Sequence, residues 1–132
     1  MNKEISIPLE KANVTLRNDG ILHIHLNAGS DIHIEDARQI FETMGKIGKG
    51  RKFPVLIDAG EFVQVDKDVQ KFSASIEGNI YTIADAIAYC SLGQKLVAGF
   101  YIRRNDPVIP TKMFSGKAPA IEWLKCFLKT ES

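Results

Sequence analysis

Hydrophobic and polar positions alternate most regularly near the start of the chain. Residues 13–17 alternate as a half-buried strand does, Asn18-Asp19-Gly20 is a strong turn signal, and residues 21–26 alternate again. In the second of these strands, His23 and His25 share the face opposite the leucines. The pattern predicts a β-hairpin.

The next two elements change from helical to strand spacing. Residues 34–47 carry their apolar side chains on one helical stripe, and Glu35 and Asp36 suit the positive end of that helix. A short apolar run, residues 53–60, follows the basic pair Arg51-Lys52 and closes with Asp58-Ala59-Gly60. Its length and composition predict a buried central strand, around which the other elements can be arranged.

Further helices and strands alternate along the second half of the chain. A second helix capped by Asp66 should turn Val69, Phe72 and Ile76 toward the core, and residues 84–90 suit a strand covered on both faces. Ser91 should cap a third helix from Leu92 to about Arg103. Residues 111–114 form a last strand, Ser115 caps the final helix, and Pro119 fits its first turn. The final helix is anchored by five large apolar side chains: Ile121, Trp123, Leu124, Phe127 and Leu128.

These elements predict an α/β protein with an amino-terminal hairpin. Strands alternating with helices favour a mixed, mostly parallel sheet of about five strands with about four helices. Residues 1–11 are expected to form an edge or irregular segment, because Pro8 cannot donate to a ladder. Residues 12–130 are expected to form one domain.

Composition narrows the classes of function. Among 132 residues, 45% are hydrophobic and 25% are charged, with a net charge of +1, so a soluble globular domain without nucleic-acid partners is expected. No stretch has the length of a membrane span, and no apolar signal segment follows the first methionine. Cys90 and Cys126 match no metal-ligand or redox spacing. The expectation is a cytoplasmic protein with reduced thiols and no cofactor.

The carboxy-terminal half resembles a known family. Residues 95–102 resemble its Phe-rich helix, Asn105-Asp106-Pro107 its Asn-x-Pro loop, residues 109–114 its Pro-Thr strand, and residues 120–124 its Glu-Trp-Leu helix. The pattern is similar to that of small bacterial STAS/SEC14-like proteins with the fold of the sporulation anti-sigma-factor antagonist (SpoIIAA-like), and it covers roughly residues 12–128. The resemblance implies that fold. It also implies partner binding in regulation, because better-known relatives act in that way.

Some of these relatives are switched by phosphorylation of a serine at the start of the helix after the central strand. The matching segment here is Val65-Asp66-Lys67-Asp68, which has no hydroxyl group. Ser73 and Ser75 lie further along the chain. The serine switch is therefore not carried over to this sequence.

Three histidines and a carboxylate raise the question of a metal site. His23 and His25 share one face of a strand, His33 follows, and Asp31 is close in sequence. The alternative is that the histidines are partly exposed polar positions on a half-buried strand. Without a further histidine or a Glu-x-x-His pattern, the sequence favours that alternative and no metal site is expected.

Asp58 and Ser91 are the candidates for chemistry at the carboxyl ends of the strands, where open α/β sheets hold ligands. No Gly-x-Ser-x-Gly motif surrounds Ser91, and no histidine is clearly brought to that edge. The sequence favours a structural interpretation, in which Asp58 accepts hydrogen bonds from loop amides and Ser91 caps a helix. Cys90 is interpreted as a small buried hydrophobe. No catalytic residue is expected.

The third helix carries a large apolar surface that includes Val97, Phe100 and Tyr101. Part of it belongs to the core, and the remainder suits a dimer interface or the wall of a pocket. Together with the resemblance, this predicts a non-enzymatic, STAS-like interaction or regulatory module that binds a protein partner or itself as a homodimer. The alternative is a SEC14-like carrier or sensor of a small apolar ligand or lipid. A hydrolase-type enzyme using Asp58 and Ser91 is a third possibility.

Overall fold

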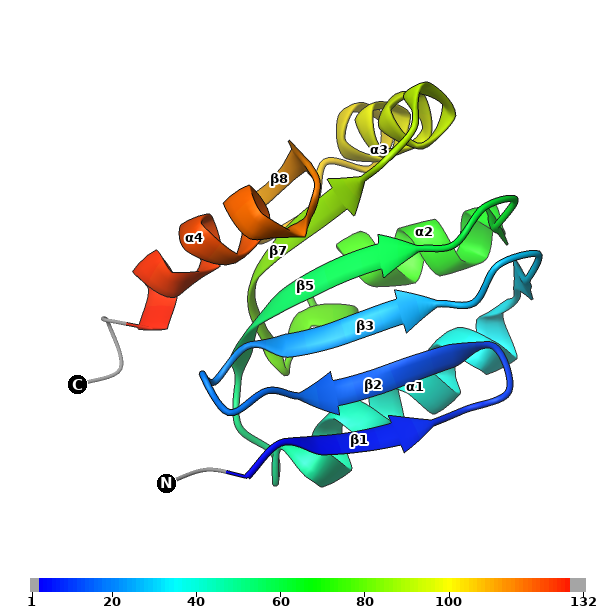
Figure 1. Ribbon diagram of the computed structural model, residues 1–132. Coiled ribbons are helices and arrows are strands. Elements are labelled where there is room, and N and C mark those ends of the chain that lie inside the picture. Colours follow the sequence, from blue (N-terminus) through cyan, green and yellow to red (C-terminus); the bar gives the residue numbers. More distant parts are fainter. Residues whose placement is uncertain (1–2, 129–132) are drawn as a thin grey trace.

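The alternating segments of the sequence assemble into a mixed sheet. The computed structural model of the chain describes residues 3–128. The strands of the sheet lie in the order β1-β2-β3-β5-β7-β8 (Figure 1). Their bounds are β1 Ile5–Pro8, β2 Ala12–Leu16, β3 Leu22–Leu26, β5 Phe53–Ala59, β7 Thr82–Tyr89 and β8 Thr111–Ser115.

The sheet divides into an antiparallel and a parallel half. β1 pairs with β2 and β2 with β3 in antiparallel register, as the Asn18-Asp19-Gly20 turn requires. β3, β5, β7 and β8 pair in parallel. The sequence predicted about five strands, and the sheet has six. The additional strand is β1, which lies at the edge of the sheet. Two further short strands, β4 (Asp31–Ile32) and β6 (Gln64–Val65), form a separate parallel pair.

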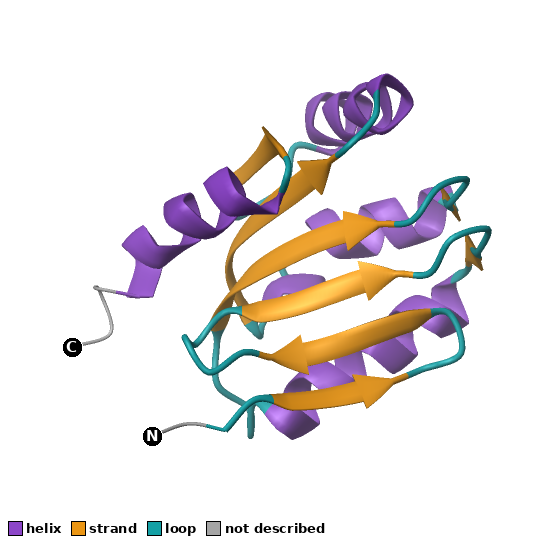
Figure 2. Cartoon of the chain, in the orientation of Figure 1, coloured by secondary structure: helices purple, strands orange, loops and turns teal. Residues whose placement is uncertain are grey.

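Helices cover both faces of the sheet (Figure 2). They are α1 (Ile34–Ile47), α2 (Lys67–Ala74), α3 (Leu92–Asn105) and α4 (Lys117–Leu128), with a 3-10 turn at Glu77–Asn79. α1 and α2 lie on one face, and α4 lies on the other, against β5, β7 and β8 (Figure 1). None of the helices within residues 3–128 has the length and apolar character needed to cross a membrane.

Strand alternation buries one apolar cluster on each face of the main sheet. The α1 face of the sheet buries a cluster that includes Val14, Leu22 and Val55, packed on Ile40 and Met44 of the helix. The α4 face buries Leu56 of β5 and a row of small β7 side chains beneath Leu124 of α4; the row is Ala84, Ala86 and Ala88. Alanine side chains leave room for α4 to approach the sheet closely.

Three local predictions need correction. Ile76 does not face the core: α2 ends at Ala74, and the Ile76 side chain is 76% exposed. Ser115 is the last residue of β8 rather than a helix cap, since α4 begins two residues later. Asp66 does precede α2, but its carboxylate makes no capping hydrogen bond and instead lies 2.7 Å from Nδ1 of His33.

Candidate functional site

The main candidate site is a cavity of about 610 Å3 on the α1 and α2 face of the sheet. Strands β3, β5 and β7 form its floor, and helices α1, α2 and α3 form its walls. Most of the lining side chains are apolar; examples are Ile40, Val55, Ile57, Val69, Phe72 and Ile87. This volume and lining are typical of sites that bind small organic molecules.

Two of the polar residues that line the cavity have no hydrogen-bond partner for their side chains among the described residues. Asp85 of β7 is only 6% exposed, and its carboxylate makes no hydrogen bond or ion pair with the described residues 3–128. The hydroxyl group of Tyr101 on α3 is buried and also lacks a hydrogen-bond partner within that range. Buried polar groups are normally satisfied, so these two groups stand out in the mostly apolar lining.

Burial also changes the protonation of both groups. Loss of solvation raises the pKa of Asp85 from 3.8 to about 7. Burial raises the pKa of Tyr101 above its usual value, and the nearby Asp85 carboxylate raises it further. Asp85 is therefore close to half-protonated near neutral pH, and Tyr101 stays a hydroxyl.

The sequence of β7 places Asp85 in the cavity. Successive strand residues point to opposite faces, and Ala84 and Ala86 are buried under α4, so Asp85 between them points to the cavity face. Sequence reasoning missed this residue because it treated residues 84–90 as an apolar strand. The signal was present, since Asp85 is the single charged residue in that run.

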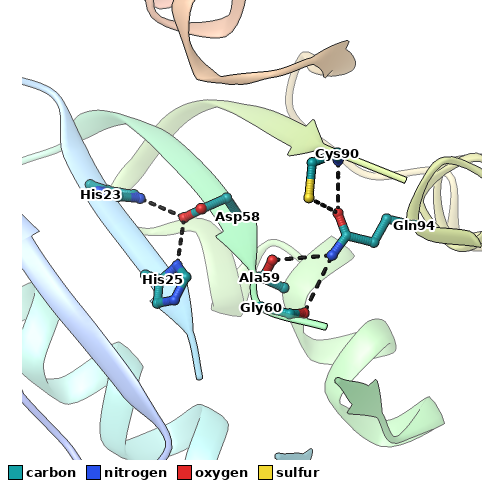
Figure 3. Close-up of polar contacts among 7 residues, drawn as sticks. All are labelled: His23, His25, Asp58, Ala59, Gly60, Cys90 and Gln94. Carbon is teal, nitrogen blue, oxygen red and sulfur yellow. Dashed lines mark hydrogen bonds and ion pairs between the residues drawn. The ribbon is translucent and has the colours of Figure 1, made fainter. Parts of the chain in front are cut away.

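Gln94 fixes α3 against the strand ends beside the cavity (Figure 3). Its Nε2 donates to the carbonyl oxygens of Ala59 and Gly60 at 3.1 and 3.3 Å, and its Oε1 accepts from the backbone N–H of Cys90 at 2.9 Å. The backbone N–H of Gln94 donates to Oγ of Ser91 at 3.1 Å. The prediction that Ser91 caps this helix is confirmed.

Cys90 does not match its predicted burial. The residue is exposed, because β7 ends at Tyr89 and the chain turns outward toward α3. Its Sγ lies 3.4 Å from Oε1 of Gln94.

Asp58 takes part in a second polar cluster on the opposite face of the sheet. Its Oδ1 lies 2.6 Å from Nε2 of His23 and 3.1 Å from Nδ1 of His25 (Figure 3). The predicted loop-amide hydrogen bonds are therefore replaced by contacts with histidines, because parallel register sets Asp58 beside His25. Burial alone would raise the pKa of Asp58, but the two histidine contacts outweigh it and leave that pKa below its usual value.

The structure brings together only some of the residues singled out from sequence. Four of them, Asp58, Ser91, Val97 and Tyr101, line the large cavity. Phe100 instead lines a smaller hollow of about 270 Å3 between α2 and α3. Val97 and Phe100 are 60% and 55% exposed. The segment matching the switch serine of relatives, Asp66-Lys67-Asp68, lies at the start of α2.

Comparison with known proteins gives one family match and two structural neighbours. Residues 14–128 match the family model described as domain of unknown function DUF7793. The search of curated proteins gave no match.

The first structural neighbour shares the fold. It is an uncharacterised protein of the DUF3478 family from Shewanella loihica PV-4, with a SpoIIAA-like fold. The TM-score is 0.58 at 17% identity, over 94% of this chain and 97% of that one. The SpoIIAA-like fold expected from the sequence is confirmed.

The second neighbour is a protein of unknown function from Arthrobacter sp. FB24. It is 24% identical over 84% of this chain and 96% of that one, with a TM-score of 0.30. That score is too low to add to the assignment of the fold.

Proposed function

We propose that this chain, which belongs to the DUF7793 family, is a non-enzymatic binding module for a small apolar molecule with a hydroxyl or amine group. The observation that carries the proposal is the apolar cavity of about 610 Å3 with Asp85 and the Tyr101 hydroxyl unpartnered among the described residues. A fold by itself does not determine function, so the argument rests on this site.

The chemistry of the cavity defines the ligand class. Its apolar walls favour a hydrocarbon or aromatic body, which gains about 25 cal/mol for each Å2 of apolar surface removed from water. The carboxylate of Asp85 accepts hydrogen bonds, and the Tyr101 hydroxyl both donates and accepts. A hydroxyl or amine on the ligand satisfies both groups, whereas a carboxylate on the ligand is repelled by ionised Asp85.

N-phenyl-1-naphthylamine is a suitable probe, because it combines two aromatic ring systems with one N–H donor and fluoresces when removed from water. We expect saturable binding of one probe molecule per chain. Ala98→Phe should abolish it by filling the cavity, since Ala98 is buried in the α3 wall. Tyr101→Phe should weaken it several-fold.

Tyr81→Phe is the matched control. Tyr81 packs against Phe41 at a ring-centroid distance of 4.9 Å but is not among the lining residues of the cavity. Its probe affinity should equal that of the wild-type protein. Absence of saturable binding, or binding unaffected by Ala98→Phe in a folded variant, would contradict the proposal. Native mass spectrometry of freshly purified protein would identify a ligand retained from the cell.

A second candidate function is contact with a partner protein through α3, with a second copy of this chain as the partner. Four apolar side chains of this helix are more than half exposed: Leu92, Leu96, Val97 and Phe100. Contiguous exposed apolar surface of this kind is typical of interfaces. Sedimentation equilibrium tests the candidate directly. A dimer converted to monomer by Leu96→Lys would support it, and a monomeric wild-type protein would exclude self-association.

A further inference from the structure

A second site lies on the sheet face opposite the cavity, where α4 contacts β5, β7 and β8 but leaves the antiparallel half less covered. His23 and His25 lie two residues apart on β3 and therefore point to the same face. The parallel register pairs His25 with Asp58 of β5, so all three side chains meet there. Their side chains are 20%, 39% and 16% exposed, respectively.

The three side chains offer one ligand atom each, and these atoms lie within 4.8 Å of one another. They are Nε2 of His23, Nδ1 of His25 and a carboxylate oxygen of Asp58. Figure 3 shows both imidazole rings directed at the carboxylate from the neighbouring strand. The ring centroids of the histidines are 6.4 Å apart with an interplanar angle of 69°, so neither ring blocks the other.

We propose that His23, His25 and Asp58 form a binding site for a divalent first-row transition-metal ion such as Zn2+. Two imidazoles and one carboxylate are a recurrent ligand set for zinc and for non-haem iron. Three protein ligands leave at least one coordination position for solvent or another molecule. Asp58 also borders the cavity, but neither histidine lines it, and the metal site does not depend on the proposed ligand binding.

The geometry needs only a small adjustment to hold an ion. Metal–ligand distances of about 2.0–2.2 Å in a tetrahedral arrangement place ligand atoms about 3.3 Å apart. The Asp58 oxygen lies 2.6 and 3.1 Å from the two histidine nitrogens, so each of these pairs needs to separate by less than about 1 Å. The two nitrogens lie within 4.8 Å of each other, so they need to approach by no more than about 1.5 Å. The ion then takes the place of the hydrogen atoms now shared between the histidine nitrogens and the carboxylate.

The neighbouring strand leaves space for the ion. Thr15 is opposite His23 and Asn13 is opposite His25 on β2, and both are small polar residues. Thr15 already shares a hydrogen bond with Ser6, at 2.9 Å between the hydroxyl oxygens. No bulky apolar side chain stands beside the histidines on that strand.

The experiment is titration of tag-free, chelator-treated protein with ZnCl2 by isothermal calorimetry. Cys90 and Cys126 are both exposed, and free thiolates bind zinc, so every protein carries Cys90→Ser and Cys126→Ser. We expect one Zn2+ ion per chain. His25→Gln and Asp58→Asn should each weaken zinc affinity at least about tenfold. Substituting residues that merely support metal ligands already lowers metal affinity by about tenfold or more.

His33→Gln is the matched control, because this histidine is exposed and its Nδ1 contacts Asp66 rather than the cluster. Zinc affinity should not change in this variant, and circular dichroism will show that every variant is folded. Adding Co2+ in place of Zn2+ should give visible absorption bands in the parent protein, which carries only the two Cys→Ser substitutions. It should give none in Asp58→Asn. Millimolar or weaker Zn2+ affinity in the parent, or equal losses in His33→Gln and His25→Gln, would overturn the proposal.

Discussion

Asp85→Asn tests whether a carboxyl group in the cavity opposes folding. The substitution keeps the size and planar shape of the side chain but removes its charge. In the wild-type protein, burial raises the pKa of Asp85 from 3.8 to about 7, so the folded state holds a proton that the unfolded state has released. Stability then falls as the pH rises between these two values, because the folded state binds more protons.

The magnitude follows from the same shift. Each pH unit between 3.8 and about 7 lowers the free energy of unfolding by about 1.4 kcal/mol, so the full cost of Asp85 is about 4 kcal/mol above pH 7. Between pH 5 and pH 7 the loss is about 2 kcal/mol, because the slope becomes smaller as the pH approaches the pKa of the folded state. Asp85→Asn should therefore be more stable than the wild-type protein by about 4 kcal/mol at pH 8, and by less at pH 5.

Urea denaturation at pH 5, 6, 7 and 8 measures this difference. Asp68→Asn is the matched control, because Asp68 is an exposed aspartate of α2. His33 also loses a stabilising interaction as the pH rises: the Asp66 hydrogen bond raises its pKa, which favours the folded state at low pH. Comparing variants at each pH removes that contribution. Parallel stability profiles for the wild-type protein and Asp85→Asn would refute the reasoning.

Three further predictions concern packing and charge. Leu56→Ala should lower the free energy of unfolding by about 2–5 kcal/mol in urea denaturation, because Leu56 is fully buried. Leu96→Ala is the control and should change that free energy by less than about 0.5 kcal/mol, because the Leu96 side chain is 53% exposed. NMR titration should place the pKa of His33 above 6.5, and Asp66→Asn should lower it toward that value. Gly78→Ala should destabilise the protein by about 1–3 kcal/mol, because a Cβ there would collide with a backbone carbonyl oxygen of α2; unchanged thermal unfolding would contradict this.

The elements with the clearest local periodicity were predicted best. The helix expected at residues 34–47 has those bounds in α1, because its stripe, acidic first turn and terminal glycine act locally. The hairpin and the central strand β5 also lie where alternation and the apolar run placed them. Strands of two residues, β4 and β6, have no period to detect, and they hold together only through pairing across more than thirty positions of sequence.

The polar sites were harder to predict because they depend on register. Sequence proximity suggested Asp31 as the carboxylate partner of His23 and His25. The residue that meets them is Asp58, which is distant in sequence but adjacent across the parallel β3–β5 pair. Alternation assigned the histidines to one face correctly, but it contains no information on which strand lies beside them.

Asp85 is a charged residue in the otherwise apolar strand β7, and packing requirements do not explain its presence. The α4 face of β7 requires small residues, and alanines meet that requirement. The other face opens into the cavity, where an apolar residue would satisfy the strand pattern without the cost of burying a carboxyl group. Natural sequences break such local rules chiefly at functional sites. The buried carboxylate and the Tyr101 hydroxyl, which has no hydrogen-bond partner among residues 3–128, thus support the proposal that the cavity binds a ligand.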